Sequence, residues 1–367
     1  SNFGIFKERD SSVVDTLVET KKKYNYPTLF TTNWAKHNND FVVEMASRLN
    51  KSGLLRKFAV ALQSLDTTTL ENIKRKNMKV NSISNILDLA KQHDITVMIE
   101  LIMTLPGETY ETWIKNYCGL LRYDNLYIES YPLSILPNSE MNDPKYMEEH
   151  GIKTTTVKLP FKDLIPEQEE MVVETKTMSF KEAQKAWIIT WLIRSMHSFG
   201  FLYYIANYIV KRYDISYYDF YIILQSGVVE SSGLFNEIYK KQQSLIKDKK
   251  FSEFYLTNWW AEIIGETDRG RFYSEVKEIL RREYQDPYLD DVFEFQNLAS
   301  YNPHVQYPIA KQFSYNFLEN KEEKCSIKFS HEGRGNHKTY KSFISLNRSS
   351  VWKSKLEINN DRSNTNQ

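Results

Sequence analysis

Cysteine is scarce in this sequence, and its scarcity excludes a disulfide-stabilised fold. The 367 residues include only two cysteines, Cys118 and Cys325, so a reducing cytosol is the expected compartment. An excess of charge of one sign is also absent, because 48 lysine and arginine residues are balanced by 47 aspartate and glutamate residues. We therefore expect neither nucleic acid nor an anionic membrane surface as the main partner.

A clean apolar run of membrane-spanning length is missing too. The most apolar segment, residues 187–210, is interrupted by Arg194 and His197, whereas a membrane helix needs about 20 predominantly apolar residues. This segment predicts a pair of buried helices instead. No charged leader followed by an apolar core comes after Ser1, so no secretory signal is visible and a cytoplasmic protein is expected.

Strand-like and helix-like segments alternate in the first part of the chain. The predicted strands are residues 1–6, 27–34, 58–65, 96–104 and 126–134, and the predicted helices are residues 9–24, 40–49, 66–76, 82–93 and 110–121. This alternation is typical of an α/β fold with parallel strands joined by right-handed crossovers, in an open sheet or in part of a barrel. We interpret residues 1–141 as a partial barrel whose first unit is absent, because a parallel sheet does not readily begin with an unprotected edge.

The remaining sequence changes in composition twice. Residues 142–178 carry mixed charge and several prolines and are predicted to be a connector or lid, residues 179–347 a mainly α-helical C-terminal domain, and residues 348–367 a polar, disordered tail. Within the helical domain we expect helices at residues 219–225, 233–246, 252–264, 271–284 and 288–297, and a terminal pair of strands at residues 312–317 and 326–330.

The joint between the strand at 96–104 and the helix at 110–121 has the composition of a ligand-binding turn. Pro106 fixes φ and removes a backbone donor, Gly107 allows a close approach that a Cβ would block, and Thr109 can cap the following helix. In α/β folds, ligands lie at the carboxyl ends of the strands. This joint is therefore where we expect a small molecule to bind.

Polar groups also follow the other strands, and on a parallel barrel all of these ends share one mouth. Such a set suits a ligand with charged and ribose-like parts. An alternative is that the polar groups only cap the helices that follow. The candidate binding residues are Asn2, Gly4, Asn33, Lys36, Gln63, Ser64, Leu105, Pro106 and Gly107.

Two carboxylates lie inside apolar strands, where an ionised group is costly without a partner. Glu100 faces either the barrel interior or a lysine or arginine, and Glu129 is a similar case. A hydrolase with paired carboxylates would need both groups to converge at about 5–9 Å. Cys325, His331 and His337 match no compact zinc spacing, so no metal site is predicted from them.

Taken together, the strand ends resemble those of radical S-adenosylmethionine (SAM) enzymes of the cobalamin-binding-domain subgroup. In that subgroup an Asn-Phe-Gly segment ends the second strand, a Trp-Ala-Lys segment ends the third, and a Leu-Pro-Asn-x-Glu-Met segment follows the sixth. The order and spacing of these motifs carry the resemblance, which extends to about residue 160. The matching segments are residues 2–5, 34–36, 61–65, 105–109, and 134–141.

The resemblance implies a partial (β/α)6 barrel that holds SAM against a 4Fe–4S cluster, which cleaves the sulfonium reductively to a radical that abstracts hydrogen from substrate. By position, Asn2 and Gly4 are expected near the methionine moiety and Gln63 and Ser64 near the ribose or carboxylate. Residues 105–107 would line the adenine through their backbone. The implied reaction is methyl transfer or a rearrangement on a small-molecule substrate, with a reductant such as ferredoxin or flavodoxin as partner.

The sequence departs from the subgroup at three points. It has no Cys-x-x-x-Cys-x-x-Cys cluster motif, it has no cobalamin-binding domain, and Thr104 stands where glycine is usual. We therefore expect an N-terminally truncated fragment that is inactive by itself, with the ligands of the cluster and of cobalamin outside this chain. The alternatives are a TIM-like hydrolase or transferase that uses Glu100 or Glu129, and a non-catalytic binding module built on residues 187–210.

Overall fold

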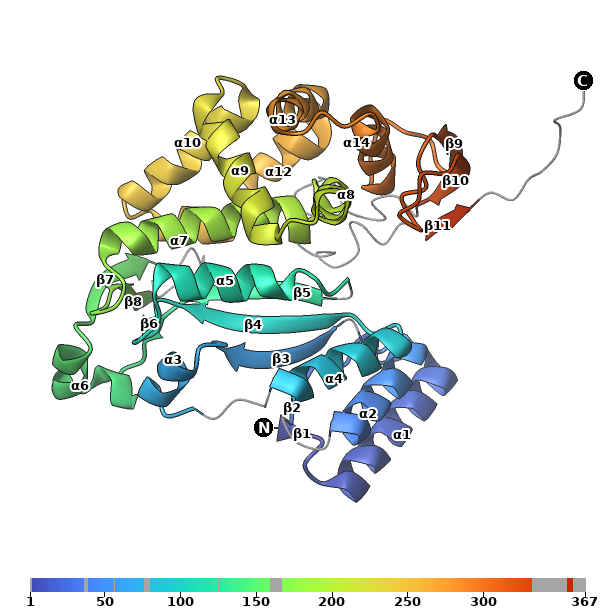
Figure 1. Cartoon of the computed structure of the whole chain (residues 1–367). Helices are drawn as coiled ribbons and strands as arrows, with labels where there is room; N and C mark the ends of the chain where they lie inside the picture. The colour runs from blue at the N-terminus through green and yellow to red at the C-terminus, as the bar shows by residue number, and fades with distance from the viewer. Residues whose placement is uncertain are drawn as a thin grey trace, which may run out of the picture. The chain divides into compact units, whose positions relative to one another are not determined.

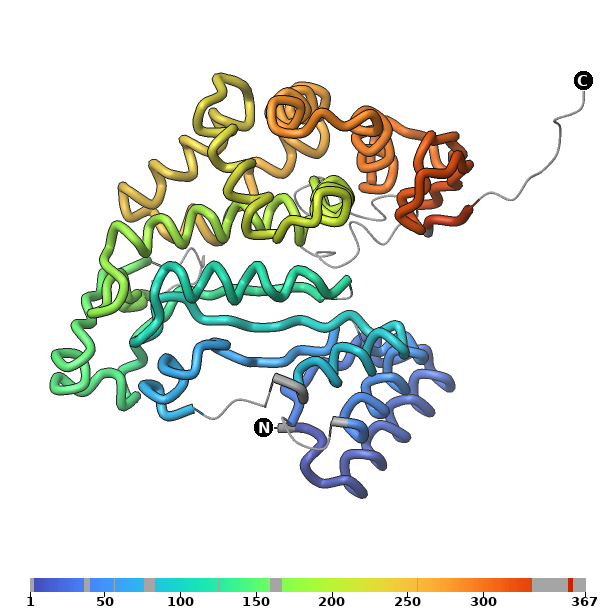
Figure 2. The backbone as a smooth tube through the Cα atoms, in the orientation of Figure 1, coloured from blue at the N-terminus to red at the C-terminus, as the bar shows by residue number. Residues whose placement is uncertain are grey.

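The structure, a computed structural model, describes residues 2–35, 39–55, 57–75, 80–124, 126–158, 167–331 and 355–358. The chain forms two compact units, of which the first comprises residues 1–156 and 168–183 and the second residues 157–167 and 184–367. Figure 1 labels the elements of both units, and Figure 2 traces the backbone in the same orientation. Each unit is described by itself below.

The first unit alternates strands and helices, as the sequence predicts. Its elements are β1 (Asn2–Phe3), α1 (Lys7–Tyr24), β2 (Asn33–Trp34), α2 (Asn39–Lys51), β3 (Phe58–Gln63), α3 (Thr67–Asn72), α4 (Val80–Gln92), β4 (Val97–Met103), α5 (Tyr110–Leu120), β5 (Leu126–Pro132), β6 (Ser134–Ile135), a 3-10 turn (Glu140–Asn142), α6 (Pro144–Glu149), β7 (Lys153–Lys158) and β8 (Gln168–Glu174).

The parallel strands stand side by side in chain order. β1 pairs with β2, β3 pairs with β4, and β4 pairs with β5, all in parallel, while β2 lies next to β3 (Figure 1). The predicted α/β class with parallel strands is confirmed. Within the described residues these strands do not close into a barrel.

Three of the predicted strands are clearly shorter than expected. The strand predicted at 1–6 is only Asn2–Phe3. The strand predicted at 27–34 is only Asn33–Trp34, and before it the Phe30 amide donates to the carbonyl of Leu54, between α2 and β3, at 2.8 Å. The predicted strand at 126–134 ends at Pro132, which has no amide hydrogen to extend the ladder. Ser134–Ile135 then forms β6, which pairs antiparallel with β8.

The predicted connector at 142–178 contains regular structure in its described part. Strands β6, β8 and β7 form a sheet in that order. A small apolar cluster packs this sheet and its neighbouring loops against the turn after β4, which joins the connector to the predicted binding turn. The cluster consists of Leu105, Leu133, Ile135, Ile152 and Val172.

The second unit is mainly helical. Its elements, with α7 beginning in the first unit, are α7 (Phe180–Ile193), a π-helix (Arg194–Ser198), α8 (Tyr203–Tyr213), α9 (Tyr217–Glu230), α10 (Leu234–Lys247), α11 (Phe251–Leu256), α12 (Trp259–Glu262), a second π-helix (Ile263–Thr267), α13 (Arg269–Glu283), α14 (Leu289–Ala299), β9 (Ile309–Phe313), β10 (Cys325–Ser330) and β11 (Lys355–Ile358).

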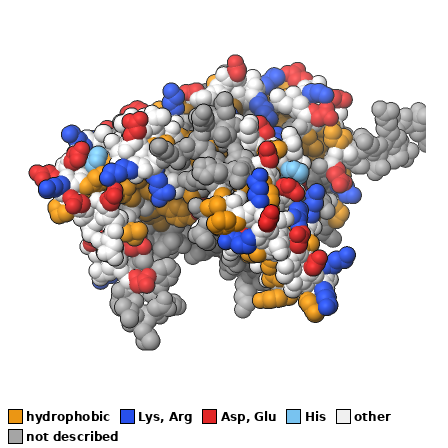
Figure 3. All heavy atoms as spheres, turned by 90° about the horizontal axis from the view of Figure 1, so that it is seen from below, with side chains coloured by type: hydrophobic (Ala, Val, Ile, Leu, Met, Phe, Trp, Pro, Cys, Tyr) orange, Lys and Arg blue, Asp and Glu red, His pale blue; other side chains and the backbone are white. Residues whose placement is uncertain are grey.

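The apolar segment 187–210 forms buried helices, as predicted. Within the described residues, no helix combines the length and the apolar character that crossing a membrane requires. The predicted helix at 252–264 is broken, since α11 ends at Leu256 and α12 begins at Trp259. On the face in Figure 3, acidic and basic side chains are interspersed, in keeping with the balanced composition.

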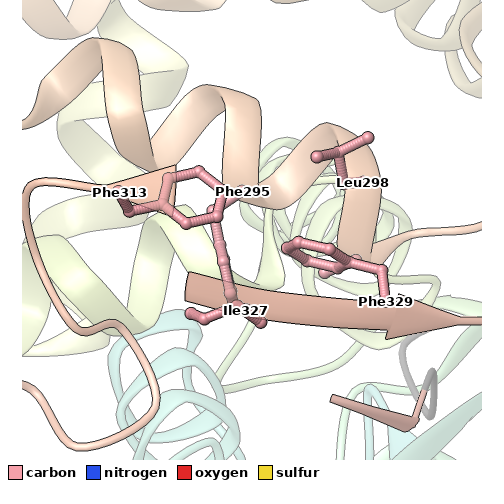
Figure 4. Packing of buried hydrophobic residues seen from close by; sticks show 6 residues of the cluster. Phe295, Leu298, Phe313, Ile327 and Phe329 are labelled. Atoms are coloured by element: carbon pink, nitrogen blue, oxygen red, sulfur yellow. The ribbon is translucent and has the colours of Figure 1, made fainter. Parts of the chain in front are cut away.

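At the C-terminal end of the second unit, α14 packs on a sheet with the order β11-β10-β9. Figure 4 shows the side chains that form the contact, Phe295, Leu298, Phe313, Ile327 and Phe329. Strand β11 pairs antiparallel with β10. The expectation of a disordered tail at 348–367 is therefore wrong for Lys355–Ile358, because the exposed edge of β10 offers this segment backbone partners; the other residues of the tail lie outside the described part.

A carboxylate from another helix caps α10. The helix begins after Gly233, which has no side chain to cap it, and Glu275 of α13 accepts hydrogen bonds from the amides of Phe235 at 2.6 Å and Asn236 at 3.2 Å. A Cβ on Gly233 would lie 2.3 Å from the Glu275 carboxylate. Gly233 therefore leaves room for the Glu275 carboxylate, and the carboxylate caps the helix in place of the side chain that Gly233 lacks.

We expect Glu275→Ala to lower the free energy of unfolding by about 2 kcal/mol, because it leaves the first amides of α10 without their acceptor. Urea unfolding followed by circular dichroism measures this loss. Glu278→Ala, an exposed position on the same helix, is the matched control and should change stability by less than about 0.5 kcal/mol. Equal effects of the two variants would contradict a capping role.

Candidate active site

The turn after β1 is organised by a buried carboxylate. Gly4 has φ +101°, and a Cβ there would lie 2.7 Å from a Val42 methyl group. Asp10, fully buried on α1, accepts hydrogen bonds from the amides of Gly4 at 2.8 Å and Phe6 at 3.1 Å. The predicted binding residue Gly4 is thus required by backbone conformation and close packing, and sequence reasoning missed Asp10, which fixes the turn.

The ends of β3 and β4 share an uncommon backbone conformation. Gln63 and Thr104 both have φ +64°, a region in which a non-glycine residue costs roughly 1–2 kcal/mol. At Gln63 a bulge interrupts the pairing of β3 with β4. The same conformation explains why glycine suits position 104, where threonine stands, and the Thr104 hydroxyl donates to the Val172 carbonyl at 3.4 Å.

The turn after β4 is closed by α3. Gly107 has φ +96°, and a Cβ there would lie 2.4 Å from the side-chain nitrogen Nδ2 of Asn72. This nitrogen donates a hydrogen bond to the Pro106 carbonyl at 3.2 Å. Thr109 then caps α5 through a reciprocal pair of hydrogen bonds with Thr112. The close approach that the sequence predicts at Gly107 is therefore made by Asn72.

A second buried carboxylate, Glu108, joins the ends of β3 and β4. The Ser64 hydroxyl donates to Glu108 Oε1 at 3.2 Å and accepts a hydrogen bond from the Asp66 amide at 3.1 Å. Burial raises the pKa of Glu108 well above its usual value, although Ser64 and the backbone of Thr104 and Leu105 act in the opposite direction. Sequence reasoning missed this role, because a glutamate at the start of a helix is ordinarily a solvated capping residue.

A pocket of about 220 Å³ lies against one side of β3. It brings together two predicted site residues, Asn33 and Gln63, and adds the Arg75 guanidinium and the Glu100 carboxylate. Its apolar wall includes Trp34 and Phe58, whose ring centroids are 5.1 Å apart, together with Ala59, Val60, Ala61 and Ile86. The lining of the pocket therefore includes amide, cationic, anionic, aromatic and aliphatic residues.

The other predicted site residues lie outside this pocket's lining. Ser64, Leu105 and Gly4 are buried in the packing described above, and Pro106 and Gly107 contact α3. Asn2 pairs with Asn33 in the β1–β2 ladder. Lys36 lies outside the described residues.

The two strand carboxylates are neighbours. Glu100 of β4 pairs in register with Ala61 of β3 and with Glu129 of β5, so that all three side chains project from one face of the sheet. Burial raises the pKa of Glu100, Lys57 opposes this effect, and Glu129 adds to it. Glu129 is buried and accepts a hydrogen bond from the Tyr127 hydroxyl at 2.7 Å.

The chain's own residues do not fit an iron–sulfur cluster. A 4Fe–4S cluster is held by several cysteine thiolates, and the sequence contains only two cysteines, of which Cys118 is buried on α5. Within the part of the chain that the structure describes, no group of three or more His, Cys, Asp or Glu side chains is placed to hold a metal ion.

In comparison with known proteins, the chain is similar to two methyltransferases, one of which is named a radical SAM enzyme. It is 25% identical over 353 residues to cobalamin-dependent radical SAM methyltransferase TokK of Streptomyces tokunonensis, which covers 86% of this chain and 51% of that protein. It is 26% identical over 341 residues to 2-(S-pantetheinyl)-carbapenam-3-carboxylate methyltransferase of Streptantibioticus cattleyicolor, which covers 83% of this chain and 50% of that protein. The chain thus spans about half the length of these curated relatives. No family model matches the sequence.

Proposed function

We propose that the chain contributes the SAM-binding part of a cobalamin-dependent radical SAM enzyme that transfers a methyl group to a small-molecule substrate. The observation that carries the proposal is the similarity to two methyltransferases over 86% and 83% of the chain. It favours methyl transfer over the alternatives of a TIM-like hydrolase and a non-catalytic binding module.

The order of the strands supports a partial barrel of the (β/α)6 type. Strands β1 to β5 follow one another in space as they do in the chain, whereas a doubly wound sheet reverses its order at a switch point. We assign β1 to β5 and their helices to such a barrel, with the C-terminal unit as a separate helical domain. The proposed binding residues remain the strand-end set, with Asn33 and Gln63 in the pocket.

The chemical groups of SAM are complementary to the residues that line the pocket. SAM carries a sulfonium, an amino acid group, ribose hydroxyls and an adenine, and the pocket presents amides, a carboxylate and a guanidinium beside the rings of Trp34 and Phe58. When bound, SAM supplies an activated methyl group. The role we assign to Asn33 and Gln63 is to orient it by hydrogen bonds at the strand ends.

We place the cluster ligands, the cobalamin-binding residues and the contact for a reductant such as ferredoxin or flavodoxin outside this sequence, because its own residues do not fit a cluster. The name of the second relative describes a carboxylate substrate with a pantetheinyl arm. By analogy we assign this protein a small organic metabolite as substrate, with the reaction in the cytoplasm.

Binding of radiolabelled SAM, measured by equilibrium dialysis, tests the site. Gln63→Gly removes the side chain in a backbone conformation that glycine adopts without strain, so we expect an affinity about five- to tenfold lower with an unchanged fold. Gln92→Ala, an exposed position on α4, should bind as the unaltered chain does. Unaltered binding by Gln63→Gly would remove Gln63 from the site, and no binding by any of the three proteins would overturn the proposal.

A further inference from the structure

The Glu100 carboxylate in the pocket lies beside two small residues of β3. On β3 the two residues opposite Met98 and Glu100 are alanines, Ala59 and Ala61, and both line the pocket together with Glu100. An alanine in register beside Glu100 leaves open the space that a larger side chain would fill. The hollow therefore exists because β3 is small at these two positions, and Glu100 forms one wall of it.

The charges around Glu100 come from three elements. Lys57, just before β3, lies close enough to favour the ionised carboxylate, and Glu129 of β5 disfavours it. Arg75, which follows α3, lines the same pocket. A ligand that enters the pocket meets Glu100 and Arg75 in its lining. Glu129 and Lys57 lie outside that lining and act on the Glu100 carboxylate with opposite sign.

We propose that Glu100 is the residue by which the pocket distinguishes SAM, a sulfonium cation, from S-adenosylhomocysteine, its neutral thioether product. The inference rests on the proposed function, because it assigns SAM to this pocket. The two ligands have the same adenosine and the same amino acid group, so a difference in their affinities reports the sulfonium charge. A half-buried carboxylate attracts a cation more strongly than an exposed one does, because less water screens it.

Discrimination of this kind suits a methyltransferase. Transfer breaks the bond between sulfur and the methyl carbon and leaves its electron pair on sulfur, so that the sulfonium becomes a neutral thioether. A nucleophilic methyl acceptor forms the new bond with its own electron pair and takes up the positive charge. A carboxylate in the wall therefore favours binding of the donor and weakens binding of the spent product. Lys57 and Arg75 oppose this effect and limit it.

Isothermal titration calorimetry of the 367-residue chain with SAM and with S-adenosylhomocysteine tests the inference. Glu100→Gln keeps the shape and removes the charge, so we expect about tenfold weaker binding of SAM and an unchanged affinity for S-adenosylhomocysteine. Glu111→Gln makes the same change of charge at an exposed position on α5 and should alter neither affinity. Ala61→Leu fills the hollow and should weaken both ligands alike.

Two further measurements separate the charge of Glu100 from a structural role. The affinity for SAM relative to that for S-adenosylhomocysteine should fall as the pH is lowered through the raised pKa of Glu100, because the protonated carboxyl carries no charge. In Glu100→Gln this ratio of affinities should be independent of pH. Glu100→Asp should restore part of the ratio. Lys57→Met, which removes a cation that opposes the charge of Glu100, should increase the affinity for SAM relative to that for S-adenosylhomocysteine.

If Glu100→Gln lowers the affinity for both ligands equally, or lowers neither affinity, the assignment of Glu100 is overturned while the SAM site stays in place. A failure of the unaltered chain to bind either ligand would instead overturn the proposed function.

Discussion

Replacing Arg269 by methionine is expected to lower the free energy of unfolding of the helical unit by about 4 kcal/mol. Arg269 is 5% exposed. Its Nε donates to the Asn297 side chain at 2.6 Å, and its Nη2 donates to the carbonyls of Asn297 at 3.2 Å and Ser300 at 3.3 Å. These acceptors lie at the C-terminal end of α14, where the helix dipole favours a cation. Methionine keeps the bulk of the side chain but leaves the buried carbonyls without donors.

Hydrogen exchange combined with urea unfolding measures this loss, and the amides at the end of α14 should lose protection first. Arg269→Lys should be intermediate, because an ammonium cannot match the planar fork of the guanidinium. Arg271→Met is the matched control on the same helix, since the Arg271 side chain is 63% exposed and pairs with Asp268 at the surface. It should change stability by less than about 1 kcal/mol. A similar loss in both methionine variants would show that the carbonyl contacts of Arg269 contribute little.

Glu108→Ala is expected to destabilise the first unit by about 3 kcal/mol. The substitution leaves a cavity at a position that is 1% exposed and removes the acceptor of the Ser64 hydroxyl, which links the end of β3 to the turn after β4. Glu71→Ala, an exposed position on α3, is the control for loss of a carboxylate. Urea unfolding measures both changes, and a loss below about 1 kcal/mol for Glu108→Ala would contradict the linking role.

Glu108→Gln should alter the pH dependence of stability in a defined direction. The folded-state pKa of Glu108 is raised, so in the window above its usual value the native state binds a proton that the unfolded state has lost. The free energy of unfolding contributed by this group therefore falls as the pH rises from about 4.5 through the folded-state pKa. Glutamine has no such proton, so the stability of Glu108→Gln relative to the unaltered chain should increase from pH 5 to pH 8. A constant difference over that range would show that Glu108 is ionised in the folded protein.

The sequence by itself determined the local structure of the first unit. The spacing of apolar residues predicted β3, β4 and the helices between the strands to within a few residues. This is possible because the apolar repeat of a strand, two residues, and that of a helix, 3.6 residues, both lie within a short segment of sequence. It also predicted the turn at 105–109, since proline and glycine act on their own backbone. The strand-end motifs predicted the radical SAM relationship that the similarity to a cobalamin-dependent radical SAM methyltransferase supports. The predicted connector and domain bounds stay predictions.

Only the tertiary structure decided which of these residues meet. The register of three strands places Ala61, Glu100 and Glu129 side by side, and no local pattern fixes a register between residues that are 39 and 29 positions apart in the sequence. Asn72 fills the space at Gly107, and Glu108 points inward to Ser64. Asn72 and Glu108 are nevertheless polar residues of a kind that is usually solvated at the end of a helix. The burial and charge environment of a side chain depend on segments distant in sequence, and these contacts form only when the chain is folded.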